Sequence, residues 1–324
     1  MSKTSDSPPR RTPLGSLTAL LSFIVTNRTA LLFVAILAGF VWDGAVFLVG
    51  PLLLPLLGTI MTLSLMDVPS AILVSPRAVI RPLLATGTVS FVLAGSLYFF
   101  MGPLVVGDPE VARGFMLLAA VPPAVAVVPF AGFLGAAMVF TLAGLVTGTL
   151  LTLVLLPLLA MVAFDGASIP VFNLLAAVIG VTLVPILLSR AIRHPALNAR
   201  IAPWRPLVLK WGFFLVMYTI IARNRAFMLA NPGELLPALL VAVVATFGLG
   251  PVIAVVARRL GFSAGEATGL VLLGVMKNGG LAAGLAVSLL SFRAALPAAV
   301  ATVVSLLYLL SLELRKGLRN RAAE

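Results

Sequence analysis

The sequence predicts an all-α integral membrane protein of about ten transmembrane helices. We expect two inverted five-helix repeats, in which the fourth and ninth helices are broken and cross. Three observations predict this fold: the apolar content, the distribution of charge along the chain, and interruptions at matching positions of its two halves. Of the 324 residues, 61% are hydrophobic and only 10% are charged, whereas a soluble domain is about 25% charged and about 45–50% apolar. This composition excludes a water-soluble fold and a disordered chain.

Ten apolar segments are bounded by proline, glycine or charged residues. Each is close to the roughly 20 residues that a helix needs to cross a bilayer, and no segment alternates as the strands of a β-barrel do. The predicted helices are 27–42, 45–66, 80–101, 111–136, 137–163, 171–192, 207–223, 233–257, 266–290 and 293–312. The predicted organisation is a tail at 1–26, a first repeat at 27–163, a connector at 164–170, a second repeat at 171–312 and a tail at 313–324.

Lysine and arginine define the orientation, because they are enriched in cytoplasmic loops. With the N-terminus inside, seventeen of these residues fall on the inner side and four fall outside, at Arg113, Arg223, Arg225 and Arg293. This asymmetry predicts a multi-pass protein of the plasma (inner) membrane with both termini cytoplasmic. The net charge of +12 then reflects topology and attraction to anionic membrane lipids, and no nucleic-acid partner is expected.

Five helices precede the connector and five follow it, so the second half must cross the membrane upside down relative to the first. Inverted repeats of this kind are typical of secondary transporters, whose sites lie where corresponding helices are interrupted. The fourth helix contains Pro122, Pro123 and Pro129, which break a helix by removing backbone donors. The ninth contains Gly279 and Gly280, which tolerate an unwound backbone.

Lys277, between Met276 and Asn278, lies near the middle of the ninth predicted helix. At 1.5 Å per residue it is roughly 16 Å or more from either surface, too deep for its amine to reach the interface easily. A charged lysine at the bilayer centre costs at least about 2.5–3.5 kcal/mol, and no acidic residue falls near it. The amine must therefore lose its proton, or stay charged against helix C-terminal carbonyls and a bound anion. A purely structural role on backbone carbonyls is the third possibility.

Other residue types narrow the chemistry. The chain has no cysteine and a single histidine, His194, which excludes disulfides, thiolate metal sites and histidine-rich haem or metal centres. We therefore expect no cofactor and no metal site. Gly144 and Gly148 have the spacing of closely packed membrane helices.

The ninth-helix stretch from Met276 to Ala283, Met-Lys-Asn-Gly-Gly-Leu-Ala-Ala, resembles the Met-Gln-Asn-Ser-Gly-Leu-Ala-Ala stretch of the bile acid:sodium symporter (BASS) superfamily. The prolines around Pro122 are similar to that family's broken fourth helix, Leu57–Met61 is similar to its second, and Ser75-Pro76-Arg77 also fits. The resemblance implies a panel domain of helices 1, 2, 6 and 7 and a core domain of helices 3–5 and 8–10. It also implies transport of organic anions by alternating access.

The departures from the family pattern concern its sodium sites. The resemblance implies that the family's sodium-binding Glu, Gln, Ser-Asn pair and Thr fall here at Leu273, Lys277, Val127-Val128 and Leu145, and that oxygens persist only at Thr86 and Thr141. Sodium, like other hard cations, needs several oxygen ligands. Two positive charges ~4 Å apart repel by about 4 kcal/mol at an effective dielectric of 20. We therefore expect no bound sodium ion beside a charged Lys277.

These observations predict a secondary active transporter of a small organic anion that is independent of sodium and could be coupled to protons through Lys277. The expected substrate or coupling site contains Lys277, Asn278, Gly279, Gly280, Met276, Pro122, Pro123, Thr86 and Thr141. A non-transporting or sensor-like binding protein on the same fold is the main alternative. A cation/proton antiporter would need a mid-membrane carboxylate. A membrane enzyme would need paired acids, for which the sequence offers only Asp108 and Glu110, and we expect no enzymatic activity.

Overall fold

The computed structural model describes residues 28–66, 76–163, 184–230 and 232–323. Within these ranges the chain is predominantly helical and contains no strand. The first half contains α2 (Arg28–Val41), α3 (Val46–Val49), η1 (Gly50–Leu52), α4 (Leu53–Leu65), α5 (Pro76–Thr86), η3 (Gly87–Gly95), η4 (Leu97–Met101), α6 (Gly102–Val105), α7 (Pro109–Ala120), α8 (Val127–Leu134) and α9 (Met138–Ala163). The second half contains α11 (Val184–Ile192), α12 (Pro195–Ile201), α13 (Arg205–Ala230), α14 (Pro232–Val243), η6 (Val244–Gly248), α15 (Leu249–Arg259), α16 (Ala264–Val275), α17 (Gly279–Leu289), η7 (Arg293–Ala295) and α18 (Leu296–Ala323).

Several helical stretches have the length and apolarity to cross a membrane, in agreement with the predicted class of protein. Among the described residues, five satisfy both conditions alone: Val79–Val105, Met138–Leu159, Arg205–Ala226, Leu235–Arg259 and Arg293–Leu312. The pair Ala30–Val41 and Val46–Leu52, bent by 115°, raises the number to six if it forms one span. The shorter helices α16 and α17 are apolar but too short to cross singly. The predicted connector and most of the predicted helix at 171–192 lie outside the described residues.

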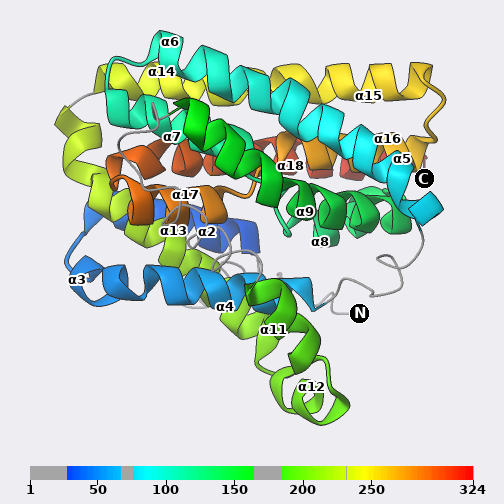
Figure 1. Ribbon diagram of the computed structural model, residues 1–324, viewed down its shortest axis with the longest axis horizontal. Coiled ribbons are helices and arrows are strands. Elements are labelled where there is room, and N and C mark those ends of the chain that lie inside the picture. The colour runs from blue at the N-terminus through cyan, green and yellow to red at the C-terminus, as the bar shows by residue number, and fades with distance from the viewer. Residues whose placement is uncertain (1–27, 67–75, 164–183, 231, 324) are drawn as a thin grey trace, which may run out of the picture.

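The helices form two groups with a third between them (Figure 1). In the first group, α13 packs along α2 and α4, and α11 packs on α4. On the opposite side, α14 and α15 form an outer layer. The broken helices α7, α16 and α17 lie between these layers with α18, where α7 contacts α9, α17 and α18. The interruptions are thus in the interior of the bundle.

Two glycines of α9 permit a close helix contact that positions the site. A Cβ atom at Gly144 would overlap the Thr86 hydroxyl, and one at Gly148 would lie 2.9 Å from Cδ of Pro123. The small-residue spacing predicted close packing, and the packing of α5 against α9 confirms it.

The predicted end of the seventh helix is wrong. The sequence places Arg223 and Arg225 in an outer loop, but α13 continues to Ala230. Both guanidinium groups have partners in other segments of the chain. Nε of Arg225 donates to the carbonyl of Phe40 in α2 at 2.6 Å, and Cζ of Arg223 lies 4.8 Å from the ring centroid of Phe292. The predicted C-terminal tail is likewise helical, since α18 continues to Ala323.

Candidate functional site

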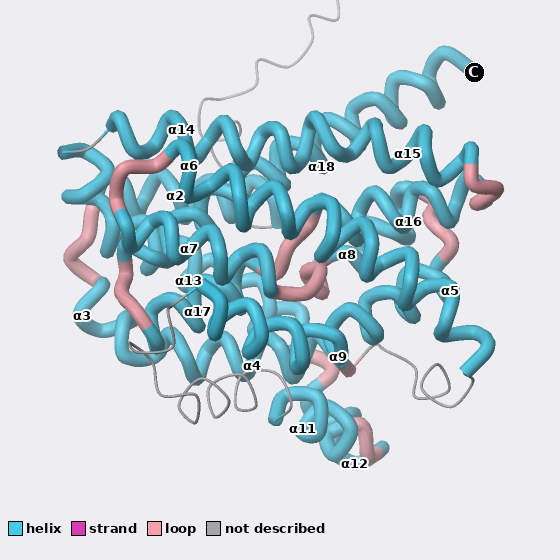
Figure 2. The backbone as a smooth tube through the Cα atoms, turned by 45° about the horizontal axis from the view of Figure 1, so that its top comes forward, coloured by secondary structure: helices cyan, strands magenta, loops and turns pink. Residues whose placement is uncertain are grey.

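The two predicted interruptions are present. α7 ends at Ala120 and α8 begins at Val127, while α16 ends at Val275 and α17 begins at Gly279. Figure 2 shows loop segments in the middle of the helical bundle, well away from the loops at its periphery. These breaks are confirmed at the positions where prolines and paired glycines predicted them.

The two unwound segments cross and pair with each other. The amide N–H of Ala124 donates to the carbonyl of Met276 at 2.7 Å, and the N–H of Asn278 donates to the carbonyl of Pro122 at 2.8 Å. In a bilayer an unpaired backbone group costs several kcal/mol, so non-helical backbone there must find partners within the protein. Each broken helix therefore satisfies part of the other's exposed backbone.

Pro123 lies directly opposite Lys277 in this antiparallel bridge. The flanking hydrogen bonds show that the two residues form the pair type that exchanges no hydrogen bond with each other. A proline at this position therefore costs no hydrogen bond between the segments. Pro122 contributes only its carbonyl, so both prolines reduce the number of donors that the break must satisfy.

The amine of Lys277 is held at the end of α7. Its Nζ donates to the carbonyls of Ala119 and Val121 at 2.9 and 2.8 Å and to Oγ of Ser90 at 3.3 Å. The ring of Phe91 lies on another side, with its centroid 4.6 Å from Nζ. Only 6% of the lysine is exposed. The amine is therefore at the crossover, enclosed by α7 and by the π-helical stretch η3.

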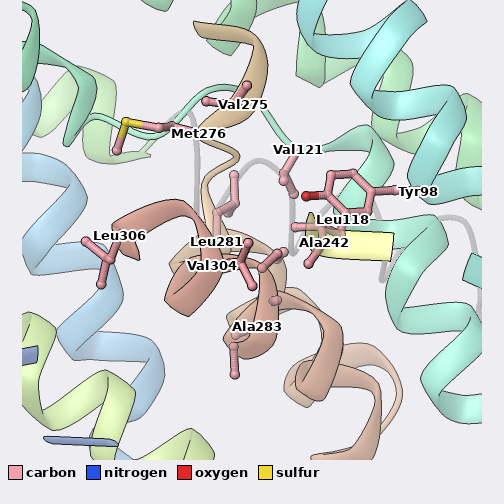
Figure 3. Close-up of a cluster of buried hydrophobic side chains, with 14 of the residues drawn as sticks. Tyr98, Leu118, Val121, Ala242, Val275, Met276, Leu281, Ala283, Val304 and Leu306 are labelled. Carbon is pink, nitrogen blue, oxygen red and sulfur yellow. The ribbon is translucent and has the colours of Figure 1, made fainter. Parts of the chain in front are cut away.

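This environment suits an ammonium group. An ammonium has three donors, and three acceptors surround it. The carbonyls belong to the C-terminal end of α7, where the last carbonyls have no helical partner and carry a partial negative charge of about half an electron. The aromatic face of Phe91 adds a cation–π attraction. Together these contacts offset the cost of placing a charge among apolar residues (Figure 3), where Val121, Val275 and Met276 are buried.

A small cavity of about 70 Å³ lies on the other side of the crossover, between the broken helices and the group formed by α2, α4 and α13. Such a volume holds a few water molecules. It is lined by Leu32, Ile60, Met61, Ala124, Val125, Ala126, Phe213, Val216, Met217, Met276, Lys277, Asn278, Gly279, Gly280, Leu281, Thr302, Ser305 and Leu306. The first residues of α17 and the residues that precede α8 are among them, so both half-helix N-termini border the cavity.

Lys277 lines this cavity, but its amine does not face it. None of the residues that contact Nζ (Ser90, Phe91, Ala119 and Val121) belongs to the lining. The amine is thus directed toward the opposite side of the crossover.

Asn278 is the polar side chain that connects the crossover to the α4 side of the cavity. Its Oδ1 accepts a hydrogen bond from the N–H of Leu281 and so caps α17, and its Nδ2 lies 3.3 Å from the sulfur of Met61. A thioether is a weak acceptor, so the amide retains donor capacity beside the cavity.

The two remaining oxygens suggested by the resemblance, those of Thr86 and Thr141, have different surroundings. Thr86 is fully buried and its hydroxyl has no hydrogen-bond partner among the described residues. The hydroxyl of Thr141 donates to the carbonyl of Ala137 at 2.9 Å within the same helix. The positions where the family holds sodium ligands are occupied by apolar side chains, of which Val127, Leu145 and Leu273 are fully buried and Val128 is partly buried.

Sequence reasoning missed the residues that hold the amine. Ser90 lies four residues after Thr86, so the spacing placed both hydroxyls on one face of the third helix and could have suggested it. Ala119 and Val121 contribute only backbone carbonyls, which no residue type reveals. Ser305 was also missed; its hydroxyl donates to the carbonyl of Val275 at 3.2 Å and satisfies the end of α16.

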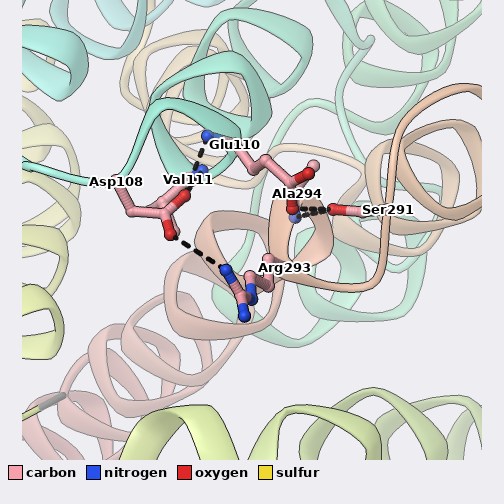
Figure 4. A network of polar contacts seen from close by, with 6 residues as sticks. All are labelled: Asp108, Glu110, Val111, Ser291, Arg293 and Ala294. Atoms are coloured by element: carbon pink, nitrogen blue, oxygen red, sulfur yellow. Dashed lines mark hydrogen bonds and ion pairs between the residues drawn. The ribbon is translucent and has the colours of Figure 1, made fainter.

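A polar network fixes the other end of α7 (Figure 4). Oδ1 of Asp108 accepts from the N–H groups of Glu110 and Val111 at 2.8 and 3.1 Å, and Oδ2 lies 3.5 Å from Nη1 of Arg293. The Ser291 hydroxyl donates to Oε2 of Glu110 at 2.6 Å. Asp108 is thus the N-cap of α7 and joins it to the segment that leads into α18.

We expect Asp108→Ala to lower the free energy of unfolding by about 1 kcal/mol, the usual value of an N-cap. The change removes the acceptor for two N–H groups and an ion-pair partner of Arg293. Glu110→Gln is the matched control, because the amide oxygen can still accept from Ser291. Unfolding of both variants in detergent measures the difference, and equal stability of Asp108→Ala and the wild type would contradict the capping role.

No protein-family model matches the sequence, and a comparison with curated proteins finds no significant match. In the described part of the chain, no group of three or more histidine, cysteine or acidic residues is placed to hold a metal ion.

Proposed function

We propose that the protein is a secondary transporter that moves a small organic anion by alternating access and needs no sodium. The observation that carries the proposal is the position of the Lys277 amine on the α7 carbonyls at the crossover. A cation tethered there supplies the positive charge that a bound ion would otherwise bring to the ends of the broken helices. The resemblance of the Met276–Ala283 stretch to the BASS superfamily supports the same class of function.

The charges around the crossover favour an anion. Each helix end carries about half an elementary charge, positive at the N-terminus and negative at the C-terminus. The N-termini of α8 and α17 and the C-termini of α7 and α16 meet here, so their partial charges sum to about zero. Lys277 then leaves the crossover with a charge of about +1, which one monovalent anion in the cavity neutralises. The preferred substrate is therefore a small monoanion such as a monocarboxylate.

Similarities between the two halves support inverted repeats and a span number of ten. α7 and α16 each have 12 residues, begin at a polar N-cap and carry a glutamate in the first turn. The preceding long spans both contain π-helical stretches, η3 and η4 in one and η6 in the other. The charge count orients this bundle with both termini in the cytoplasm. The cavity then lies toward the cytoplasmic ends of α2, α4 and α13.

Proton coupling through Lys277 is the second part of the proposal. A proton that leaves the amine would remove the charge that balances the anion, so anion and proton would move together. Such coupling makes anion flux depend on a pH gradient, whereas a permanently charged amine would leave flux insensitive to it.

The test is flux of a panel of radiolabelled organic anions into proteoliposomes in which choline replaces sodium. We expect uptake of at least one monoanion, driven further by an inward proton gradient. Uptake that occurs only with sodium would contradict the proposal. Stabilisation of the protein by an anion without any flux would favour the alternative of a binding protein on a transporter fold.

A further inference from the structure

Two neighbouring residues of α13, Arg223 and Asn224, lie beyond the cavity on the side that the charge count places outside. Phe213 and Met217 of α13 line the cavity. Ile220 and Asn224 follow at helical spacing on the same face of α13. α13 also packs against η7, α14 and α18, which lie outside the group formed by α2, α4, α11 and α13. The stripe from Phe213 to Asn224 therefore extends from the cavity toward the contact of α13 with η7, α14 and α18, which we call the seam.

Arg223 of α13 reaches across the seam to Phe292. Its guanidinium lies over the ring of Phe292, just before η7, with 4.8 Å between Cζ and the ring centroid. Nη2 would also be 2.7 Å from a Cβ atom at Gly50, so the guanidinium lies against the start of η1 as well. A cation over an aromatic face is an attractive contact that is lost if the two groups separate.

Asn224, in contrast, destabilises the closed seam. It is 1% exposed, and its Nδ2 donates to the carbonyl of Ile220 at 2.8 Å. Its Oδ1 has no hydrogen-bond partner among the described residues. A buried acceptor left unpaired lowers the equilibrium constant for the closed state by about 5- to 150-fold, and the acceptor regains hydrogen bonds when water enters.

We propose that Arg223 and Asn224 form the outer gate of the transport path, in which Arg223 holds the gate closed and Asn224 keeps it able to open. The inference rests on the proposed alternating access, and it concerns a part of the molecule that contacts neither the amine of Lys277 nor the cavity. Because the Arg223 contact stabilises the closed gate and the unpaired Asn224 oxygen destabilises it, both the closed and the open conformation remain accessible.

The chain contains no cysteine, so a single Ile220→Cys substitution gives a specific reporter within the seam. In intact cells, a membrane-impermeant thiol reagent added outside should label this cysteine slowly. We expect Arg223→Ala to speed labelling and Asn224→Leu to slow it about tenfold, because leucine has a similar volume and no unpaired acceptor. Thr219→Val is the matched control, since Thr219 is equally buried but its hydroxyl donates to the carbonyl of Leu215.

Unchanged labelling in both Arg223→Ala and Asn224→Leu, or labelling only from the cytoplasmic side, would overturn the gate. Monodisperse elution of each purified variant shows that a change is not due to unfolding. The labelling needs no substrate, so it is independent of anion flux. If labelling follows the expected order but no anion flux is found, the gate is supported and anion transport is contradicted. If anion flux is found but labelling is unchanged in the variants, anion transport is supported and the gate is contradicted.

Discussion

Lys277→Met is expected to abolish anion transport and to destabilise the protein. Methionine fills a similar volume but leaves the carbonyls of Ala119 and Val121 without their donor. Each buried acceptor left unpaired costs about 1–3 kcal/mol. Transport is lost because the crossover no longer carries the charge that balances the anion. Flux in proteoliposomes and unfolding of the same preparation in detergent measure the two effects.

Two further variants separate charge from hydrogen bonding. Lys277→Gln supplies N–H donors without charge, so we expect it to regain part of the stability but to remain inactive. Lys210→Met is the control, because it makes the same substitution near the N-terminus of α13, far in sequence from the crossover. It should change the free energy of unfolding by less than about 0.5 kcal/mol. Full transport by Lys277→Gln would show that the charge of the amine has no role.

Gly279→Ala is expected to have the second large effect. A Cβ atom at this position would overlap the hydroxyl of Thr302 and lie 2.9 Å from the carbonyl of Ala298. α17 would have to move away from α18, which disturbs the crossover at the residue after Asn278. Overpacking of this kind costs about 1–3 kcal/mol, and the displaced N-terminus of α17 should reduce transport. Unfolding in detergent and flux measure the change.

Gly58→Ala is the control for this substitution, because a Cβ atom there meets nothing within 4 Å. Alanine is about 1 kcal/mol better than glycine in a helix interior, so this variant should be at least as stable as the wild type. Adding Thr302→Ala to Gly279→Ala should restore part of the lost stability by removing one of the two overlaps. Equal loss of stability in the single and double variants would show that the overlap with Thr302 is not the cause.

The sequence predicted the breaks because proline and glycine act on the backbone where they stand. Pro122 removes a donor in any context, and Gly279 permits an unwound start to α17. The depth of Lys277 was predictable in the same way, from its distance to the ends of an apolar segment.

The partners of the amine were not predictable, because they are 156 to 187 residues away in the chain and two of the three are backbone carbonyls. The end of α13 was missed for a related reason. Arg223 and Arg225 suggested a loop, yet their charges are accommodated by an aromatic ring and a carbonyl from distant segments. Tertiary contacts of this kind allow charged residues to lie within a helix where the local sequence predicts a loop.

We propose that the Lys277 amine is enclosed at the crossover, where its protonated form balances the charge of the anion. Reductive methylation of the folded protein, followed by mass spectrometry of its peptides, tests this most directly. The chain has four lysines, at positions 3, 210, 277 and 316, so each site can be followed separately. Enclosure of the amine predicts that Lys210 is methylated while Lys277 remains unmodified until the protein is unfolded. Methylation of Lys277 at the rate of Lys210 in the folded protein would contradict it.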